Sequence, residues 1–247
     1  MISRYASLRQ GLVGAWCPSL GASGFSLIDR GYGNHGTLTN MDPGTDWVAS
    51  GGKLALDFDG TNDFVVATIP LFSGSLSFSV WAKGVPGNAN TNYMASIPVA
   101  SSGSNGVDFK NPTNAQANLS LDGNFVTINS GVDIRDSWSH LLLGYGNGVA
   151  FFYVNGILVG SQAWGNGVSS LSSRQLNLGR FGTFGSHSPV QLDDIRLYNR
   201  ALSPTEIQQL YTGGRGVGLI PERIKHRRKT TAAAFNRRRR ILIGASQ

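Results

Sequence analysis

The sequence has little of what several protein classes require. Cys17 is the only cysteine among 247 residues, which excludes an internal disulfide framework and a cysteine-rich zinc site. No stretch approaches the roughly 18 consecutive apolar residues of a membrane span, so we expect no membrane insertion. The N-terminus shows no apolar run followed by a small-residue cleavage site, and we therefore expect no secretory signal.

Glutamate is also scarce, which bears on carbohydrate hydrolysis. The acidic residues are two glutamates, Glu206 and Glu222, and twelve aspartates. Retaining glycosidases place two carboxylates about 5 Å apart. Asp57 and Asp59 share one face of an expected strand and are the pair that a glycanase could use. We favour a role for both in the turn at Gly60, and therefore expect no enzyme.

Positive charge is concentrated at one end of the chain. The formal net charge is +7, yet residues 215–247 hold ten lysines and arginines against Glu222 alone, a net +9. The rest of the chain therefore carries a net −2. Charge asymmetry of this kind is typical of an interaction arm joined to a folded body.

Residues 11–212 carry the pattern of an all-β domain. Glycine and asparagine recur about every 8–12 residues, with short runs of β-branched and aromatic residues between them, as in antiparallel sandwiches. In Ser75–Ala82 apolar residues occupy every second position, which predicts one buried face. Strands are predicted at Leu12–Trp16, Leu54–Phe58, Phe64–Thr68, Ser75–Ala82, Phe125–Ile128, Ser139–Leu143, Val149–Val154, Ile157–Gly160, Gln175–Gly179 and Gln191–Leu197.

Two local signals fix a turn and a helix. Asn155-Gly156 separates two strand-like runs and predicts a type I′ hairpin, because both residues tolerate a positive φ. Ser203 followed by Pro204, with Glu206 three residues after the serine, predicts the start of a helix with a capping box. The helix is expected to end before Gly213-Gly214.

The order of several motifs resembles that of a laminin-G-like domain. These motifs are Gly11–Trp16, Asp29–Leu38, Ala55–Val65, Phe78–Trp81, Trp138–His140, Phe152–Gly156 and Asp193–Ser203. The resemblance implies an all-β concanavalin A-like jelly-roll sandwich of two antiparallel sheets, with one short C-terminal helix and an extended basic arm. We divide the chain into an N-terminal segment (1–10), the jelly roll (11–212) and a glycine hinge with a basic docking arm (213–247).

The resemblance also implies a calcium site. Many laminin-G-like domains hold Ca²⁺ with aspartates and backbone carbonyls near a sheet edge. Asp29 and Asn34 could supply hard oxygen ligands, and Asp193 or Asp194 could close a structural Ca²⁺ site from a distant strand. The alternative is that Asp29 and Asn34 cap a turn through their own backbone.

Tryptophans in loops are the candidates for sugar stacking. Trp164 and Trp47 lie in glycine-rich or polar segments and are the expected glycan-binding residues. A partly buried role as a loop anchor is the alternative for Trp164. Trp16, Trp81 and Trp138 belong to strand motifs and are expected in the core.

The basic arm is expected to dock onto a partner after a flexible glycine-rich hinge over residues 213–218. Apolar residues separate its charge clusters, and an acidic protein surface suits both features. Nucleic acid is an alternative through counterion release. An anionic membrane fits less well, because the apolar residues form no amphipathic stripe. The expected docking residues are Arg223, Arg227, Arg228, Phe235, Arg237, Arg238, Arg239 and Arg240.

The combination of an adhesive fold, no export signal and a basic arm predicts a virion protein, assembled in the host cytoplasm. Laminin-G-like chains with an Arg-rich C-terminus resemble structural proteins of tailed bacteriophages. We expect a non-enzymatic capsid decoration or other virion-surface protein, a homo-oligomer docked to capsid subunits by its arm, with weak glycan contact. The alternatives are a carbohydrate-binding adhesion module of an extracellular bacterial protein and a glycanase of the same fold.

Overall fold

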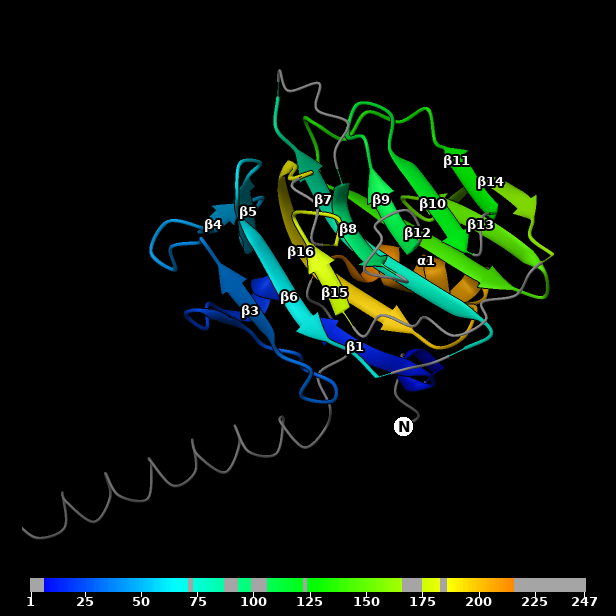
Figure 1. Cartoon of the computed structure of the whole chain (residues 1–247), viewed down its shortest axis with the longest axis horizontal. Coiled ribbons are helices and arrows are strands. Elements are labelled where there is room, and N and C mark those ends of the chain that lie inside the picture. The colour runs from blue at the N-terminus through cyan, green and yellow to red at the C-terminus, as the bar shows by residue number, and fades with distance from the viewer. Residues whose placement is uncertain are drawn as a thin grey trace, which may run out of the picture.

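The protein folds as two antiparallel β-sheets packed face to face, with one short helix outside them (Figure 1). The computed structural model describes residues 7–70, 73–86, 93–98, 106–121, 124–165, 175–182 and 186–215. This architecture is the predicted jelly-roll sandwich. None of the helices in these ranges is long and apolar enough to cross a membrane.

Sheet A lies behind the other sheet in Figure 1 and has the strand order β14-β13-β12-β7-β16-β5-β4, with β1 also paired to β16. Strand β16 pairs with β1, β5 and β7, which are far from it in the sequence. The strands are β1 (Leu12–Trp16), β4 (Trp47–Ser50), β5 (Lys53–Asp59), β7 (Leu76–Gly84), β12 (Ser139–Gly146), β13 (Val149–Val154), β14 (Ile157–Ala163) and β16 (Pro189–Tyr198).

Sheet B lies at the front of Figure 1 and has the order β11-β10-β9-β8-β15-β6-β3-β2. A long crossover places β15 between β8 and β6, so residues near 178 meet residues near 65 and 95. The strands are β2 (Ser26–Leu27), β3 (Gly36–Thr39), β6 (Phe64–Thr68), β8 (Tyr93–Pro98), β9 (Gly106–Lys110), β10 (Gln116–Leu121), β11 (Asn124–Asn129) and β15 (Gln175–Leu178).

The core fills the space between the two sheets. Phe78 of β7 in sheet A stacks on Phe109 of β9 in sheet B with ring centroids 5.1 Å apart, and Phe152 of β13 lies 6.0 Å from Phe109. All three rings are buried completely or nearly so. Alternation along each strand sends such residues inward and leaves the intervening ones on the outer faces.

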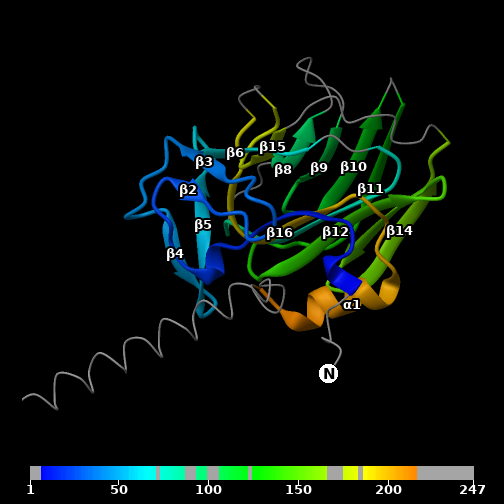
Figure 2. The same cartoon turned by 90° about the horizontal axis from the view of Figure 1, so that it is seen from below.

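The outer face of sheet A is covered by helix α1 (Pro204–Gly213), which lies below the sandwich in Figure 2. Ile207 and Leu210 of α1 pack with Leu142 of β12 and with Leu8, so the N-terminal turn η1 (Ser7–Arg9) joins the same cluster. Ser203 caps the helix in the predicted capping box with Glu206. A second short turn, η2 (Pro18–Leu20), follows β1.

The hairpin between β13 and β14 turns at the predicted pair. Asn155 has a φ of 51° and Gly156 a φ of 76°, the two positive values that a type I′ turn requires. This turn sets the register in which Val154 faces Ile157. Asn147 and Gly148, between β12 and β13, have the same pair of positive φ values, 51° and 76°.

Candidate functional site

A row of polar side chains crosses the face of sheet B that points away from the core. Asn177 of β15 is in register with Ser96 of β8, and Ser96 with Asp108 of β9. Asn118 of β10 continues the row from Asp108, and Thr127 of β11 ends it. The residues that flank Asp108 and Asn118 along their strands belong to the core, so the row occupies the opposite face.

Hydrogen bonds link three members of this row into a chain. The Thr127 hydroxyl donates to Asn118 Oδ1 at 2.7 Å, and Asn118 Nδ2 donates to Asp108 Oδ1 at 2.6 Å. Among the described residues, the Asp108 carboxylate accepts a hydrogen bond from Asn118 only. Its second oxygen accepts no hydrogen bond within the same ranges. Asn177 Nδ2, farther along the row, is buried and lacks a partner in the same part of the chain.

A cavity of about 160 Å³ opens over this row. Its walls combine hydrogen-bonding groups with aromatic rings, the mixture that small-molecule sites use to fix orientation and to bury apolar surface. The described residues that line it are Tyr93, Asp108, Lys110, Asn118, Ser120, Phe125, Thr127 and Phe181.

Aromatic side chains and cations border the cavity. Phe125 is 72% exposed, although a phenylalanine of a soluble domain is ordinarily buried. Tyr93 packs against Phe181 with centroids 4.5 Å apart, and Lys110 Nζ lies 5.7 Å above the Tyr93 ring. Next to Phe181, the Arg180 guanidinium stacks on Phe64 at 3.3 Å, which extends the cationic and aromatic surface along the sheet.

The electrostatics of the cavity centre on Asp108. This side chain is 4% exposed, and burial raises the pKa of its carboxyl to about 7. The Asn118 hydrogen bond and the Lys110 charge oppose that rise. Burial of the phenol raises the pKa of Tyr93, and the nearby Asp108 charge raises it further. The cavity thus holds a carboxyl group that changes its charge near neutral pH.

Trp164 and Trp47, the predicted glycan-binding residues, lie elsewhere and are buried. Trp164 is 3% exposed and Trp47 is 8% exposed, and both belong to the main core. The Trp47 indole N–H donates to the Gly24 carbonyl at 3.1 Å. The interpretation of these two residues as sugar-stacking platforms is wrong, because their ring faces are packed against apolar side chains.

Asp29 and Asn34, the first half of the predicted calcium site, form a capped turn. The Asp29 carboxylate accepts hydrogen bonds from the backbone N–H groups of Ala15, Gly31, Tyr32 and Asn34, at 2.8 to 3.0 Å. The Asn34 side-chain amide donates to the Val13 carbonyl. Both Asp29 oxygens are thus engaged with donors, as the turn-capping alternative expected.

Asp194, from the second half of that site, is tied to a buried arginine. Arg196 donates to both Asp194 oxygens, at 2.5 and 2.8 Å, and the Cys17 thiol donates to one of them at 3.2 Å. Burial raises the pKa of the Cys17 thiol. The positive φ of Asp194, 48°, marks the bulge where β16 breaks register with β7.

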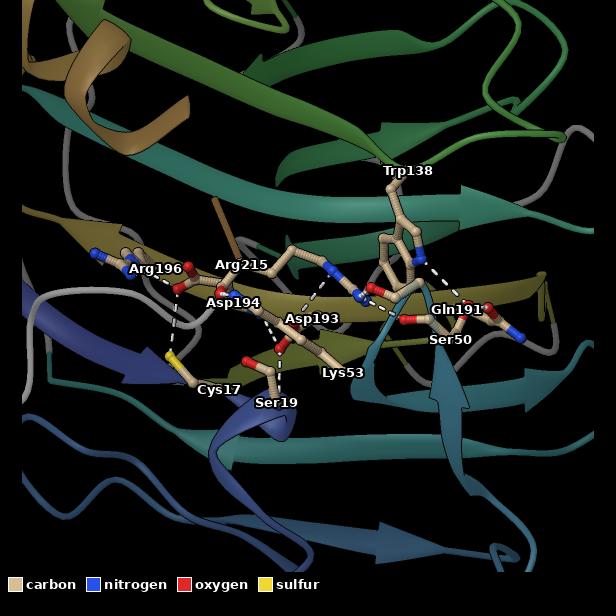
Figure 3. Close-up of polar contacts among 11 residues, drawn as sticks. Cys17, Ser19, Ser50, Lys53, Trp138, Gln191, Asp193, Asp194, Arg196 and Arg215 are labelled. Atoms are coloured by element: carbon tan, nitrogen blue, oxygen red, sulfur yellow. Dashed lines mark hydrogen bonds and ion pairs between the residues drawn. The ribbon is translucent and has the colours of Figure 1, made fainter. Parts of the chain in front are cut away.

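Asp193, which is 0% exposed, faces Arg215 instead (Figure 3). Arg215 Nε lies 3.7 Å from Asp193 Oδ2, and Asp193 Oδ1 accepts hydrogen bonds from the backbone of Ser19 and Asp194. Burial and the adjacent Asp194 charge raise the pKa of Asp193 to about 6. The Arg215 guanidinium also reaches the Ser50 carbonyl, while Figure 3 shows it lying against Trp138.

The position of Arg215 corrects the predicted hinge. Gly213 belongs to α1, and Arg215, assigned to the arm from the sequence, is 6% exposed and fixed to the body. Lys53 also donates to the Arg215 carbonyl. The expected core residue Trp138 is half-buried, because it supplies the ring beneath this arginine. The predicted docking residues, from Arg223 to Arg240, lie outside the described residues.

No metal site emerges from the described part of the chain. It contains no group of three or more His, Cys, Asp or Glu side chains arranged to hold an ion. Asp29 is saturated with N–H donors and Asp193 and Asp194 face guanidinium groups, so these residues do not fit a cation. Ca²⁺ binding stays a prediction that this geometry does not favour.

Asp57 and Asp59, the glycanase candidates, lie at the end of β5 and around a turn. Asp59 Oδ1 accepts from the backbone of Thr61 at 2.7 Å and Asn62 at 3.2 Å, which is the turn role expected at Gly60. Burial raises the pKa of Asp57, whose side chain also bonds to Gln191. The absence of enzymatic activity stays a prediction.

The cavity was not predicted, because its residues lie on the four strands β8 to β11 and on the segment that follows β15. Individually Asn118, Thr127 and Lys110 are unremarkable. The one local signal is Phe125, which alternation along Asn124–Asn129 places on the same face as Thr127, opposite the core residues Val126 and Ile128. An apolar ring at an outward position is the feature that could have marked this face.

The sequence identifies the family. A model described as the concanavalin A-like lectin/glucanases superfamily matches residues 58–208, more than half of the chain. The chain therefore belongs to this superfamily, within its laminin G-like branch. A search of curated proteins found no match.

Solved structures with the same fold include toxins and an enzyme. The binding domain of Paraclostridial Mosquitocidal Protein 1 is 16% identical with a TM-score of 0.66, over 83% of this chain and 52% of that one. The botulinum neurotoxin serotype D ligand binding domain, in complex with N-acetylneuraminic acid, is 16% identical with a TM-score of 0.66, over 85% of this chain and 53% of that one. A Trypanosoma rangeli sialidase, in complex with 2,3-difluorosialic acid, is 17% identical with a TM-score of 0.60, over 81% of this chain and 33% of that one. The chain spans about half the length of the two binding domains and a third of the sialidase.

Proposed function

We propose that the protein is a non-enzymatic carbohydrate-binding domain whose site is the cavity on the outer face of sheet B. The observation that carries this proposal is the combination of an ordered hydrogen-bond chain, Thr127 to Asn118 to Asp108, with the exposed ring of Phe125. The cavity of about 160 Å³ is smaller than the roughly 300–1,000 Å³ of drug-sized sites, so it suits a single sugar ring.

The side chains that line the cavity match both the polar hydroxyl groups and the apolar ring face of a sugar. Hydroxyl groups both donate and accept hydrogen bonds, and the Asn118 and Thr127 side chains offer both functions within one row. The C–H face of a sugar ring is apolar and packs against an aromatic ring, for which Phe125 and Tyr93 are placed at the rim. Because Asn118 and Asp108 are held by each other, the site is formed before a ligand arrives.

Binding without hydrolysis fits the described groups best. Glycoside hydrolysis uses two carboxylates on either side of the scissile bond. Asp108 is the one carboxylate among the described residues that line the cavity. The botulinum domain that shares this fold is in complex with N-acetylneuraminic acid, which supports a sugar as the ligand class.

Glycan-array screening followed by calorimetric titration of the full chain tests this proposal. We expect Phe125→Ala to weaken binding at least tenfold without changing the melting temperature, because the ring is exposed. Phe25→Ala is the matched control, since this ring is 66% exposed and precedes β2 at the opposite edge of sheet B. Equal binding by wild type and Phe125→Ala, or no binding to any glycan, would overturn the proposal.

We propose secondly that this domain is carried on the surface of a virus particle, attached by the Arg-rich segment. The anchoring of Arg215 supports an attachment role, because the residue that precedes the Arg-rich segment is bound to the folded body. Sedimentation of the full chain against residues 1–215, with and without nuclease, tests it. Loss of nuclease-resistant assembly on truncation would support protein docking, whereas nuclease-sensitive, salt-dependent assembly would show nucleic-acid binding instead.

A further inference from the structure

The cavity on sheet B contains a cation, Lys110, that no described acid pairs with. Lys110 follows Asp108 by two residues on β9, so both side chains lie on the same outer face. Among the described residues Lys110 forms no ion pair, and its ammonium lies instead 5.7 Å above the Tyr93 ring. Arg180, next to the cavity residue Phe181, is likewise without an ion pair in the described ranges and stacks on Phe64.

The one acid that lines the described part of the cavity does not cancel this charge. Asp108 points at Asn118, and its carboxyl is 4% exposed. The groups that face it are Asn118 from β10, Ser96 from β8, Lys110 from its own strand and the Tyr93 phenol from β8. Because burial raises the pKa of Asp108 to about 7, the carboxyl is largely neutral in mildly acidic solution.

We propose that the ligand of this site is an acidic sugar with one carboxylate, such as a hexuronate, bound with its negative charge toward Lys110. This inference rests on the proposed carbohydrate-binding function and specifies its ligand class. The sugar hydroxyls meet Asn118 and Thr127, and the ring packs on Phe125. A protonated Asp108 donates a hydrogen bond to the ligand, whereas an ionised Asp108 repels it.

The proposal predicts a defined pH dependence. Ionisation of Asp108 places a second negative charge beside the sugar carboxylate, so affinity falls as the pH rises through about 7. We expect the loss between pH 5.5 and pH 8.5 to be on the order of tenfold, and smaller at high salt. A neutral sugar in the same cavity would show little of this loss.

Calorimetric titration with D-glucuronate and D-galacturonate, each against its neutral methyl ester, provides the test. We expect the acids to bind wild type more tightly than the esters at pH 5.5. Lys110→Gln should abolish that preference, because it removes the positive charge that faces the sugar carboxylate. Asp108→Asn, which imitates the protonated carboxyl, should bind the acids equally at pH 5.5 and pH 8.5.

The outcomes separate this inference from the proposed function. Esters that bind as well as the acids, with both weakened by Phe125→Ala, would overturn the acidic-sugar inference and leave carbohydrate binding intact. Failure of every acid and ester to bind would overturn the inference, and a glycan array without any signal would remove the proposed function too. An acid preference that survives Lys110→Gln would also contradict the inference.

Discussion

The guanidinium carbon of Arg215 lies 3.9 Å from the centroid of the Trp138 ring, at the point where the described chain ends. The same guanidinium faces the fully buried Asp193 and bonds to the Gly51 carbonyl at 3.2 Å. Figure 3 shows this residue bridging β16 and the turn between β4 and β5. Arg215 therefore holds the end of the described chain against the domain.

Arg215→Ala should destabilise the domain. The change leaves the Asp193 carboxylate buried without its cation, and breaking such a pair costs roughly 3 kcal/mol. Urea unfolding at pH 8, above the raised pKa of Asp193 at about 6, should show the full loss. Arg135→Ala removes an exposed ion pair with Asp133 and should leave the midpoint unchanged. Equal effects of the two substitutions would contradict the structural role of Arg215.

The pair of Arg200 and Glu206 should govern stability in acid. Two hydrogen bonds from Arg200, with those from the Ser203 N-cap, lower the pKa of Glu206 to about 2. A lowered folded-state pKa stabilises the protein above the unfolded value near 4.3, and that contribution is lost as the pH falls toward 2. Glu206→Gln should therefore be less stable than wild type at pH 7 and equal to it at pH 2, measured by thermal unfolding. A constant difference across this range would contradict the assignment.

Asp108 should act on stability in the opposite sense. Its raised folded-state pKa means that the folded protein binds more protons than the unfolded chain between about pH 4 and pH 7. Wild type should therefore lose stability relative to Asp108→Asn as the pH rises through this range. The difference in melting temperature between the two proteins isolates the contribution of Asp108 titration, since the other titrating groups are common to both. A difference independent of pH would show that Asp108 titrates normally.

Trp164→Ala should damage the fold rather than ligand binding. The ring is 3% exposed in the main core, and deleting a buried aromatic side chain costs roughly 3–5 kcal/mol. Phe125→Ala should do the reverse, with stability kept and glycan affinity lost. Urea unfolding and glycan titration on both variants check this contrast. Normal stability of Trp164→Ala would restore the earlier interpretation of an exposed tryptophan.

The sequence was sufficient for the parts of the fold that local patterns determine. Residues 12–16 and 64–68 form strands with the predicted bounds. Turn-forming residues stand near both ends, Gly11 and Pro18 at the first strand and Asn62 and Pro70 at the second. The capping box at Ser203 and the Asn155-Gly156 turn depend on neighbouring residues alone. The strands β8, β9 and β10 were not predicted, since alanine and serine in β8, glycine, aspartate and lysine in β9, and alanine and asparagine in β10 carry weak strand preference.

The site depended on tertiary placement and could not be predicted from local patterns. The neighbourhood of Asn177, Ser96 and Asp108 exists only after β15 inserts between β8 and β6. Trp164 was misjudged because a tryptophan suits both a sugar platform and a core. Arg215 was misjudged because glycines around it indicate a hinge, while its partners Trp138 and Asp193 come from segments that are distant in the sequence.

The location of the sugar on sheet B is tested most directly by NMR. Backbone amide shifts of the full chain would be followed during titration with the strongest glycan found by the array. The account predicts that the largest shifts fall in β9, β10 and β11, around Asp108, Asn118 and Phe125, and vanish in Phe125→Ala. Largest shifts in sheet A, around Asp193 and Arg215 or near Trp164, would contradict it.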